Sequence, residues 1–175
     1  MDLKKYIRSI QDYPKKGILF RDITTLIKNE KAFSECIDQI VERSKKFKFN
    51  KLAAIESRGF VFASAVSYIL KKPFILLRKK NKLPAERFSV DFELEYGTAT
   101  IEMHKDSISS GDKVVIIDDL IATGGTAIAA GNLIKKLGAN IHEYSFLVNL
   151  PDLGGEKKLK DYDYCVHYLI KYDGE

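Results

Sequence analysis

The sequence has few residues of the kinds that disulfide scaffolds and metal sites require. It contains 2 cysteines and 3 histidines in 175 residues. Cys36 falls on the apolar side of an expected helix and Cys165 in a strand-like run, so we interpret both as reduced core thiols. His104, His142 and His167 are scattered without the spacing of metal ligands. We therefore expect no protein-built metal site.

Long apolar segments are also missing. No stretch reaches the roughly 18–20 apolar residues that a membrane-spanning helix needs. Residues 1–6 lack the apolar centre of a signal peptide. With reduced cysteines, these absences predict a cytoplasmic protein. A hydrophobic content of 45% and a charged content of 30% suit one globular domain over residues 1–175.

A net charge of +5 favours anionic partners, but it does not choose between nucleic acid, membrane and phosphorylated metabolites. One basic cluster follows directly on an apolar run and consists of Arg78, Lys79, Lys80 and Lys82. A second basic group, at 157–160, is spread along a segment that we interpret as a solvated surface.

Apolar periodicity predicts alternating strands and helices. Helices are expected at about 32–47, 60–70 and 127–137, and strands at 52–55, 74–77, 98–103, 114–117, 141–148 and 165–170, with residues 79–97 polar and irregular. The run Val114–Ile117 is entirely β-branched and apolar, which is typical of the middle of a parallel sheet. The alternation indicates an α/β fold with a mostly parallel sheet flanked by helices.

Three of the expected strands are followed by polar clusters. These clusters are 56–59, 78–80 and Asp118-Asp119. Ligands of parallel α/β sheets bind at the carboxyl ends of the strands. We therefore expect the three clusters to converge on one crevice.

The segment after Asp119 has the composition of a phosphate-binding loop. Ala122–Thr126 carries two glycines and two threonines between a buried strand and a helix. Glycines let backbone N–H groups approach an anion, and the helix N-terminus adds positive potential. Asp118 and Asp119 would repel a bare phosphate but can accept hydrogen bonds from sugar hydroxyls. The combination suggests a phosphorylated ribose, although a glycine-containing turn with a helix-capping threonine is the simpler alternative.

Two common nucleotide motifs, G-x-x-x-x-G-K-[ST] and G-x-G-x-x-G after a strand, are absent. Val114–Thr126 instead resembles the motif that binds phosphoribosyl pyrophosphate (PRPP) in type I phosphoribosyltransferases. The likeness extends from about Ile10 to Ile170. It implies that family's fold, with a small N-terminal hood (about residues 1–30) and a mobile lid (about residues 82–95).

The version of this motif at Leu120–Thr126 resembles the adenine-specific branch of the family. The resemblance implies transfer of a phosphoribosyl group from PRPP to adenine, giving AMP and pyrophosphate in purine salvage. Mg²⁺ would arrive on PRPP rather than in a protein cage. A homodimer is implied, and neither nucleic acid nor membrane is an expected partner.

The resemblance also implies roles for single residues. Asp118 and Asp119 would hold the ribose hydroxyls. The residues expected around the 5′-phosphate are Ala122, Thr123, Gly124, Gly125 and Thr126. The residues expected on the pyrophosphate side are Arg58, Arg78 and Lys82, next to a cis peptide at Glu56-Ser57. Glu95 would move the proton on the base, Tyr96 would close over the reacting centre, and Glu95 and Arg58 are the catalytic candidates.

For the base, the resemblance points to Ile18, Leu19, Phe20 and Arg21, together with Leu120. Phe20 would stack on adenine, and Arg21 would steady the segment. Without the resemblance, Phe20 would be interpreted as a core residue and Arg21 as a surface ion-pair partner. Asn81, where glycine is common, and Phe92, near a frequent tyrosine position, depart from the family pattern. The segment 149–156 also resembles the family but is assigned no chemistry.

Two alternatives stay open. The chain could transfer the phosphoribosyl group to another base, namely xanthine, guanine, hypoxanthine or orotate. It could also be a PRPP-sensing regulator that binds nucleic acid, for which salt-dependent binding would be expected.

Overall fold

A seven-stranded sheet forms the centre of the molecule in the computed structural model, which describes residues 1–94 and 97–174. The strand order is β5-β6-β4-β3-β7-β8-β9. The strands are β3 (Lys51–Ile55), β4 (Phe74–Lys79), β5 (Arg87–Leu94), β6 (Gly97–His104), β7 (Lys113–Ile121), β8 (Asn140–Asn149) and β9 (Val166–Lys171). Neighbours from β4 to β9 are parallel, whereas β5 and β6 pair antiparallel. The mostly parallel α/β fold is confirmed.

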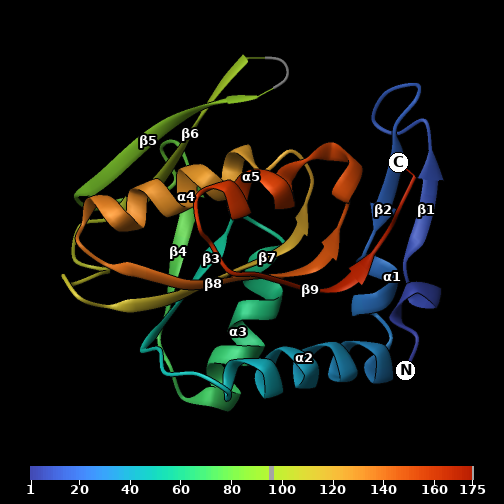
Figure 1. Cartoon of the computed structure of the whole chain (residues 1–175), viewed down its shortest axis with the longest axis horizontal. Coiled ribbons are helices and arrows are strands. Elements are labelled where there is room, and N and C mark those ends of the chain that lie inside the picture. The colour runs from blue at the N-terminus through green and yellow to red at the C-terminus, as the bar shows by residue number, and fades with distance from the viewer. Residues whose placement is uncertain (95–96, 175) are drawn as a thin grey trace.

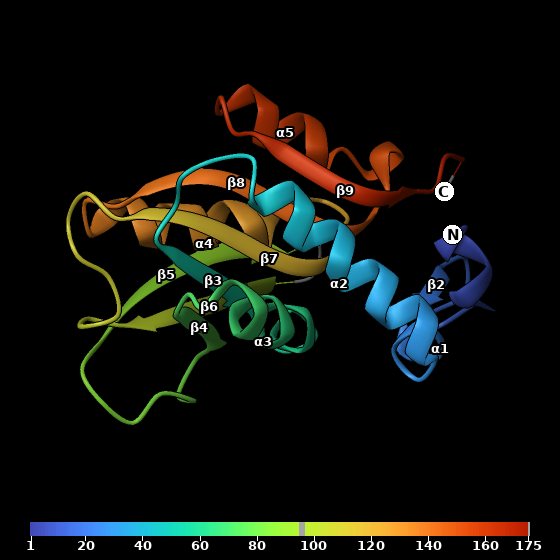
Figure 2. The same ribbon diagram turned by 90° about the horizontal axis from the view of Figure 1, so that it is seen from below.

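Helices cover both faces of this sheet (Figures 1 and 2). α2 (Glu30–Ser44) and α3 (Gly59–Leu70) pack on one face, and α4 (Gly125–Lys136) and α5 (Gly155–Asp161) on the other. Successive residues of β7 face opposite layers, because Val115 and Ile117 belong to the first core and Val114 and Ile116 to the second. All four are fully buried, as expected for a central strand.

The N-terminal segment forms a separate small layer beside the C-terminus (Figure 1). It consists of a 3-10 helix (Leu3–Tyr6), the antiparallel pair β1 (Arg8–Gln11) and β2 (Leu19–Asp22), and α1 (Thr24–Ile27). Asp22 joins these parts, since it accepts hydrogen bonds from Thr24 and Arg8 that lower its pKa to about 2. The sequence had assigned no elements to this segment.

The stretch 79–97 is not irregular as expected. Arg87–Leu94 forms β5, which pairs with β6 in continuous register from Arg87↔His104 to Leu94↔Gly97. Phe88, Val90 and Phe92 alternate with exposed residues and pack against the core. The many charged residues of this stretch concealed a period of two that the sequence does contain.

The interpretation of both cysteines as core residues is correct for Cys36 and wrong for Cys165. Cys36 is buried in the core as a free thiol, and burial raises its pKa to about 12. Cys165 is free but exposed, because it immediately precedes β9, a strand at the edge of the sheet. Within residues 1–94 and 97–174, no helix has both the length and the apolar character needed to cross a bilayer.

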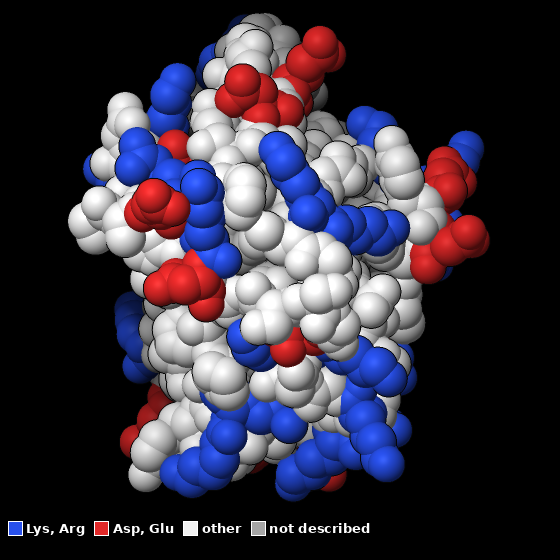
Figure 3. All heavy atoms as spheres, turned by 90° about the vertical axis from the view of Figure 1, so that its left-hand side faces the viewer, with Lys and Arg blue, Asp and Glu red and all other residues white. Residues whose placement is uncertain are grey.

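One end of the molecule carries many basic side chains (Figure 3). Figure 3 shows lysine and arginine spread over this end, mixed with acids above and dominating the lower edge. Lys45, Lys46 and Lys48 are exposed in the turn after α2. Lys157, Lys158 and Lys160 are likewise exposed on α5, in agreement with the interpretation of that segment as a solvated surface.

Candidate functional site

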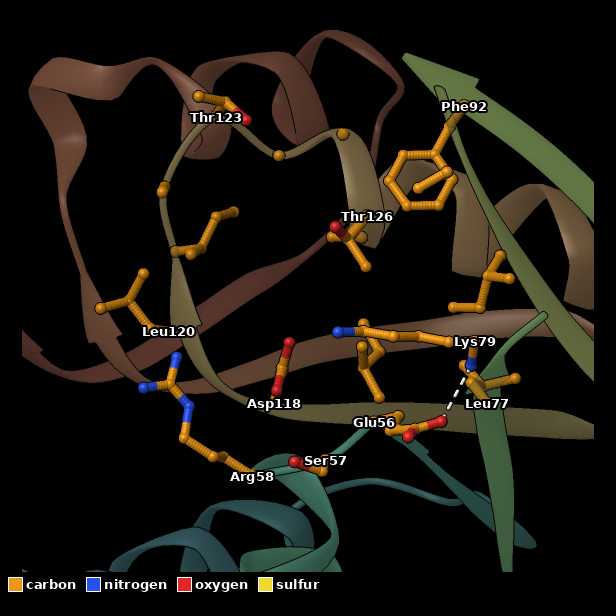
Figure 4. A pocket seen from close by; sticks show the side chains of 18 of the residues that line it. Glu56, Ser57, Arg58, Leu77, Lys79, Phe92, Asp118, Leu120, Thr123 and Thr126 are labelled. Carbon is orange, nitrogen blue, oxygen red and sulfur yellow. Dashed lines mark hydrogen bonds between the residues drawn. The ribbon is translucent and has the colours of Figure 1, made fainter. Parts of the chain in front are cut away.

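The carboxyl ends of β3, β4 and β7 open into one cavity of about 650 Å³. The three strands are adjacent and parallel, so the polar residues that follow them reach the same place. The walls include Glu56, Ser57 and Arg58, then Arg78, Lys79 and Lys80, then Asp118 through Ala127. The expected convergence of the three clusters is confirmed (Figure 4).

The expected phosphate loop arches over this cavity between β7 and α4 (Figure 4). All of Ala122–Thr126 lines the cavity. Gly124 precedes α4 with φ +81°, a left-handed conformation that favours glycine. The N-terminus of this 12-residue helix therefore faces the cavity, where it can stabilise an anion.

Asp118 and Asp119 lie inside β7, which continues to Ile121, and not after its end as expected. Asp118 points into the cavity (Figure 4) and accepts a hydrogen bond of 2.8 Å from the Asp119 N–H. Burial and the charge of Asp119 raise the pKa of Asp118 well above its ordinary value. Burial also raises the pKa of Asp119, although the charge of Arg58 opposes that shift.

One carboxylate oxygen of Asp119 is available to accept a hydrogen bond. Its side chain is 5% exposed, and its Oδ2 lies 2.9 Å from Nε of Arg58 as an ion pair. Within the described part of the chain, this buried Oδ2 accepts no hydrogen bond. The charge of Arg58 compensates part of the cost of burying this oxygen, and a ligand hydroxyl would supply the missing hydrogen bond.

Gly59 allows α3 to begin directly beneath the two aspartates. A Cβ atom at this position would lie 2.8 Å from the Ile117 carbonyl oxygen and 3.0 Å from Oδ1 of Asp118. Any side chain would therefore push the start of α3 away from β7. The close approach brings Arg58, the residue before Gly59, to Asp119.

The loop before α3 also fixes Arg78. Its Glu56-Ser57 peptide bond is cis, in agreement with the family resemblance. The Glu56 carboxylate accepts hydrogen bonds from Lys79 N–H (2.9 Å) and Arg78 Nε (3.2 Å). Partial burial acts to raise the pKa of Glu56, but these donors lower it overall. Nothing in the sequence alone pairs Glu56 with Arg78, and its part in the site was missed.

The structure does not bring Lys82 into the cavity wall. Its side chain is exposed, and its backbone carbonyl accepts a hydrogen bond of 3.1 Å from Arg78. Asn81 has φ +64°, a left-handed conformation that asparagine tolerates better than most residues. Phe92, noted in the sequence only as a departure, lines the cavity from β5. Glu95 and Tyr96 lie outside the described residues.

The expected base-binding segment lies next to Arg58. The ring of Phe20, on β2, is 5.6 Å from the guanidinium carbon of Arg58, and Tyr13 packs edge-on against it. Arg21 points elsewhere, since it stacks 3.9 Å above the Tyr172 ring and donates a hydrogen bond to Ser9.

The remaining base candidates differ in position. Ile18 is 42% exposed and Leu19 is partly buried. Leu120 lines the cavity directly. The cavity wall therefore includes Leu120, with the Phe20 segment beside it.

A model of the phosphoribosyl transferase domain matches residues 22–172. The chain is 68% identical to the adenine phosphoribosyltransferase of Pelagibacter ubique over 99% of both chains, and 48% identical to that of Chlorobaculum tepidum over the full length of both. The crystal structure of adenine phosphoribosyltransferase from Thermoanaerobacter pseudethanolicus is similar with a TM-score of 0.94, at 45% identity over 98% of both chains.

The Saccharomyces cerevisiae adenine phosphoribosyltransferase, solved with an imino-altritol bisphosphate and adenine, has a TM-score of 0.87 at 37% identity over 94% of both chains. The chain belongs to the phosphoribosyltransferase family. Its full-length relatives place it in the adenine-specific branch.

Proposed function

We propose that this chain transfers the phosphoribosyl group of PRPP to N9 of adenine, giving AMP and pyrophosphate in purine salvage. The observation that carries the proposal is the acid pair and phosphate loop that share one cavity in a chain with adenine-specific relatives. The C1–oxygen bond to pyrophosphate breaks, the C1–N9 bond forms, and adenine loses a proton.

The ribose 5-phosphate half of PRPP would bind at the end of β7. Asp118 and Asp119 accept hydrogen bonds from the ribose hydroxyls, and this role is supported by Oδ2 of Asp119, which accepts no hydrogen bond from the described residues. Ala122, Thr123, Gly124, Gly125 and Thr126 surround the 5′-phosphate with backbone N–H groups and two hydroxyls. The carboxylates also favour the positive charge that develops on the sugar as the bond to pyrophosphate breaks.

The pyrophosphate half would lie toward β3 and β4. Arg58 and Arg78 supply positive charge there, and Lys82 joins them if its exposed side chain turns inward. Mg²⁺ would arrive bound to PRPP, since it prefers substrate phosphate oxygens and water to a cage of protein ligands. When bound, Mg²⁺ neutralises charge on the leaving group.

Adenine would lie between the hood (residues 1–30) and Leu120. Phe20 stacks on the purine, the backbone of residues 18–21 reads its edge, and Arg21 steadies the segment through Tyr172. Glu95 takes the N9 proton while Tyr96 covers the reacting centre. The lid (residues 82–95), which includes β5, closes over the cavity and excludes water.

The working form would be a homodimer. α3, which begins directly after Arg58, exposes Val61, Tyr68 and Ile69, and the neighbouring strand β4 exposes Leu76. Large apolar side chains on one surface are typical of an interface. A second copy of the chain would cover them near the pyrophosphate side of the site.

Turnover with a panel of bases tests the function. Protein is supplied with PRPP, Mg²⁺ and one of adenine, hypoxanthine, guanine, xanthine or orotate, and pyrophosphate release is followed. Release with adenine alone is expected. Release with a different base would overturn the assignment of the Phe20 segment, and PRPP binding without any release would favour the regulator.

Glu95→Gln tests the proton transfer. The amide keeps the size of the side chain but cannot take the proton, so kcat falls while PRPP binding stays close to wild type. An unchanged kcat would remove Glu95 from the mechanism.

A further inference from the structure

The turn that follows β8 packs directly on the phosphate loop. This turn runs through a short 3-10 helix (Pro151–Leu153) into α5, in the segment to which the sequence assigned no chemistry. The Leu150 N–H donates a hydrogen bond of 3.0 Å to the Ile121 carbonyl. The Gly155 N–H donates one of 2.9 Å to the Ala122 carbonyl. The start of the loop, at Ile121 and Ala122, is therefore hydrogen-bonded to a second segment of the chain.

The two backbones touch without side chains between them. A Cβ atom on Gly155 would lie 2.3 Å from the Ala122 carbonyl oxygen and 2.7 Å from the Gly124 nitrogen. A Cβ atom on Gly124 would lie 2.9 Å from Cα of Gly155. Real Cβ atoms essentially never make contacts under 3.0 Å, so a side chain at either position would force the two backbones to shift.

This contact determines which groups of the loop face the ligand. A loop that binds an anion must direct its N–H groups inward and its carbonyls outward. The carbonyls of Ile121 and Ala122 point to the turn, and that of Gly124 accepts a hydrogen bond of 2.9 Å from Ile128 in α4. The negative ends of these peptide groups are thereby held away from the cavity.

Side chains fasten the same turn to the sheet. Asn149, fully buried at the end of β8, donates a hydrogen bond to Oε2 of Glu156. Lys160 donates one of 2.6 Å to the other carboxylate oxygen. Glu156 immediately follows Gly155, so this network limits movement of the contact with Ala122.

We propose that Gly155 is a positioning residue for 5′-phosphate binding, acting through the carbonyl of Ala122 and the backbone of Gly124. Glu156 supports it by holding the turn in place. The inference rests on the proposed function, because it assigns the phosphate of PRPP to the loop. It extends the site to a segment that does not itself line the cavity.

Gly155→Ala tests the inference, with Gly154→Ala as the matched control. At Gly155 the added methyl group displaces the loop, so the dissociation constant for PRPP with Mg²⁺, measured by calorimetry, rises at least about tenfold, or about 1.4 kcal/mol. Binding of adenine stays unchanged. Gly154 has φ +78° and open space around its Cα, so its variant carries backbone strain without the clash. It is expected to melt lower but to bind PRPP like wild type.

Glu156→Ala is a second test of the positioning role, and it decides the question if Gly155→Ala does not fold. It loosens the turn without adding atoms, and PRPP binding weakens about threefold or more while adenine binding is kept. A merely structural role would lower the melting temperature and leave PRPP affinity unchanged. Folded variants that bind PRPP as wild type does would overturn the positioning role alone. Wild-type protein that binds no PRPP would overturn the proposed function, and this inference with it.

Discussion

Replacing Asp119 by asparagine is expected to weaken ribose recognition without destabilising the fold. The buried Oδ2 of Asp119 accepts no hydrogen bond within the described chain and lies beside Arg58. In the proposed complex it accepts from a ribose hydroxyl, and hydrogen bonds to charged groups contribute about 1.5–3 kcal/mol. The amide loses the charge, so kcat/KM for PRPP falls roughly 10- to 150-fold at about 1.4 kcal/mol per tenfold. KM for adenine stays near wild type.

The stability of Asp119→Asn should be kept or increased, although its activity falls. Burial raises the pKa of Asp119 above its ordinary value of 3.8, and Arg58 offsets only part of this. The folded protein then binds a proton that the unfolded chain has lost, so stability falls as pH rises from 3.8 to the folded pKa. Asparagine does not titrate and avoids this loss. Arg58, whose side chain is 42% exposed, stays solvated without its partner. Asp119→Asn is therefore expected to melt at or above the wild-type temperature at pH 7.

Asp112→Asn is the matched control. Asp112 is also a buried acid, but a hydrogen bond from the Ser109 N–H, above all, lowers its pKa, and Lys51 lies 2.9 Å away. Its lowered pKa means that the ionised form stabilises the fold, a contribution that is lost as pH falls through the folded pKa. Neutralising it should lower the melting temperature without changing kcat/KM. The reasoning fails if Asp119→Asn retains kcat/KM for PRPP within about threefold of wild type, or if both variants lose activity alike.

Three further substitutions test other contacts. Arg78→Ala removes a cation from the side of the cavity where we propose that pyrophosphate binds, and should raise KM for PRPP about tenfold in initial-rate assays, with KM for adenine as the internal control. Gly131→Ala places a Cβ atom 2.1 Å from the Tyr144 hydroxyl and should lower the free energy of unfolding by about 1–3 kcal/mol in urea, a loss that Tyr144→Phe partly restores if the clash is its cause. Arg43→Leu leaves Glu143, only 1% exposed, without its partner and should cost about 2–3 kcal/mol, less than a fully buried pair because Arg43 is 34% exposed. Recovery in the Arg43→Leu/Glu143→Leu double variant is expected, and no recovery would exclude the unpaired charge as the cause.

The parallel sheet and the position of the site were predictable because each central strand combines an apolar run and a polar cluster within one short segment. In β7, four buried apolar residues precede Asp118 and Asp119, so the strand and the chemistry at its end can be recognised together. The carboxyl ends of parallel strands lie at one edge of the sheet, so the three polar clusters could be expected to meet there, as they do in the cavity between β3, β4 and β7.

The elements that were missed depend on partners far along the chain. β5 contains an apolar alternation at Phe88, Val90 and Phe92, but its polar neighbours favour a loop until β6 pairs with it. The small N-terminal sheet consists of strands of only four residues, too short for a period to be read. Cys165 looked like a core residue because an edge strand has the same local composition as a central one.

The contrast between local motifs and distant partners also applies to the residues of the site. Residues that we propose touch a substrate, such as Asp118 and the loop Ala122–Thr126, belong to compact motifs because one turn must present several groups at once. Residues that hold those groups are scattered, since any segment that packs nearby can serve. Glu56 orients Arg78 from the turn after β3, and Gly155 holds the Ala122 carbonyl from beyond β8. Substitutions of the holding residues should therefore weaken only the half of PRPP whose partner they orient, whereas a general loss of folding would weaken adenine and both halves of PRPP together.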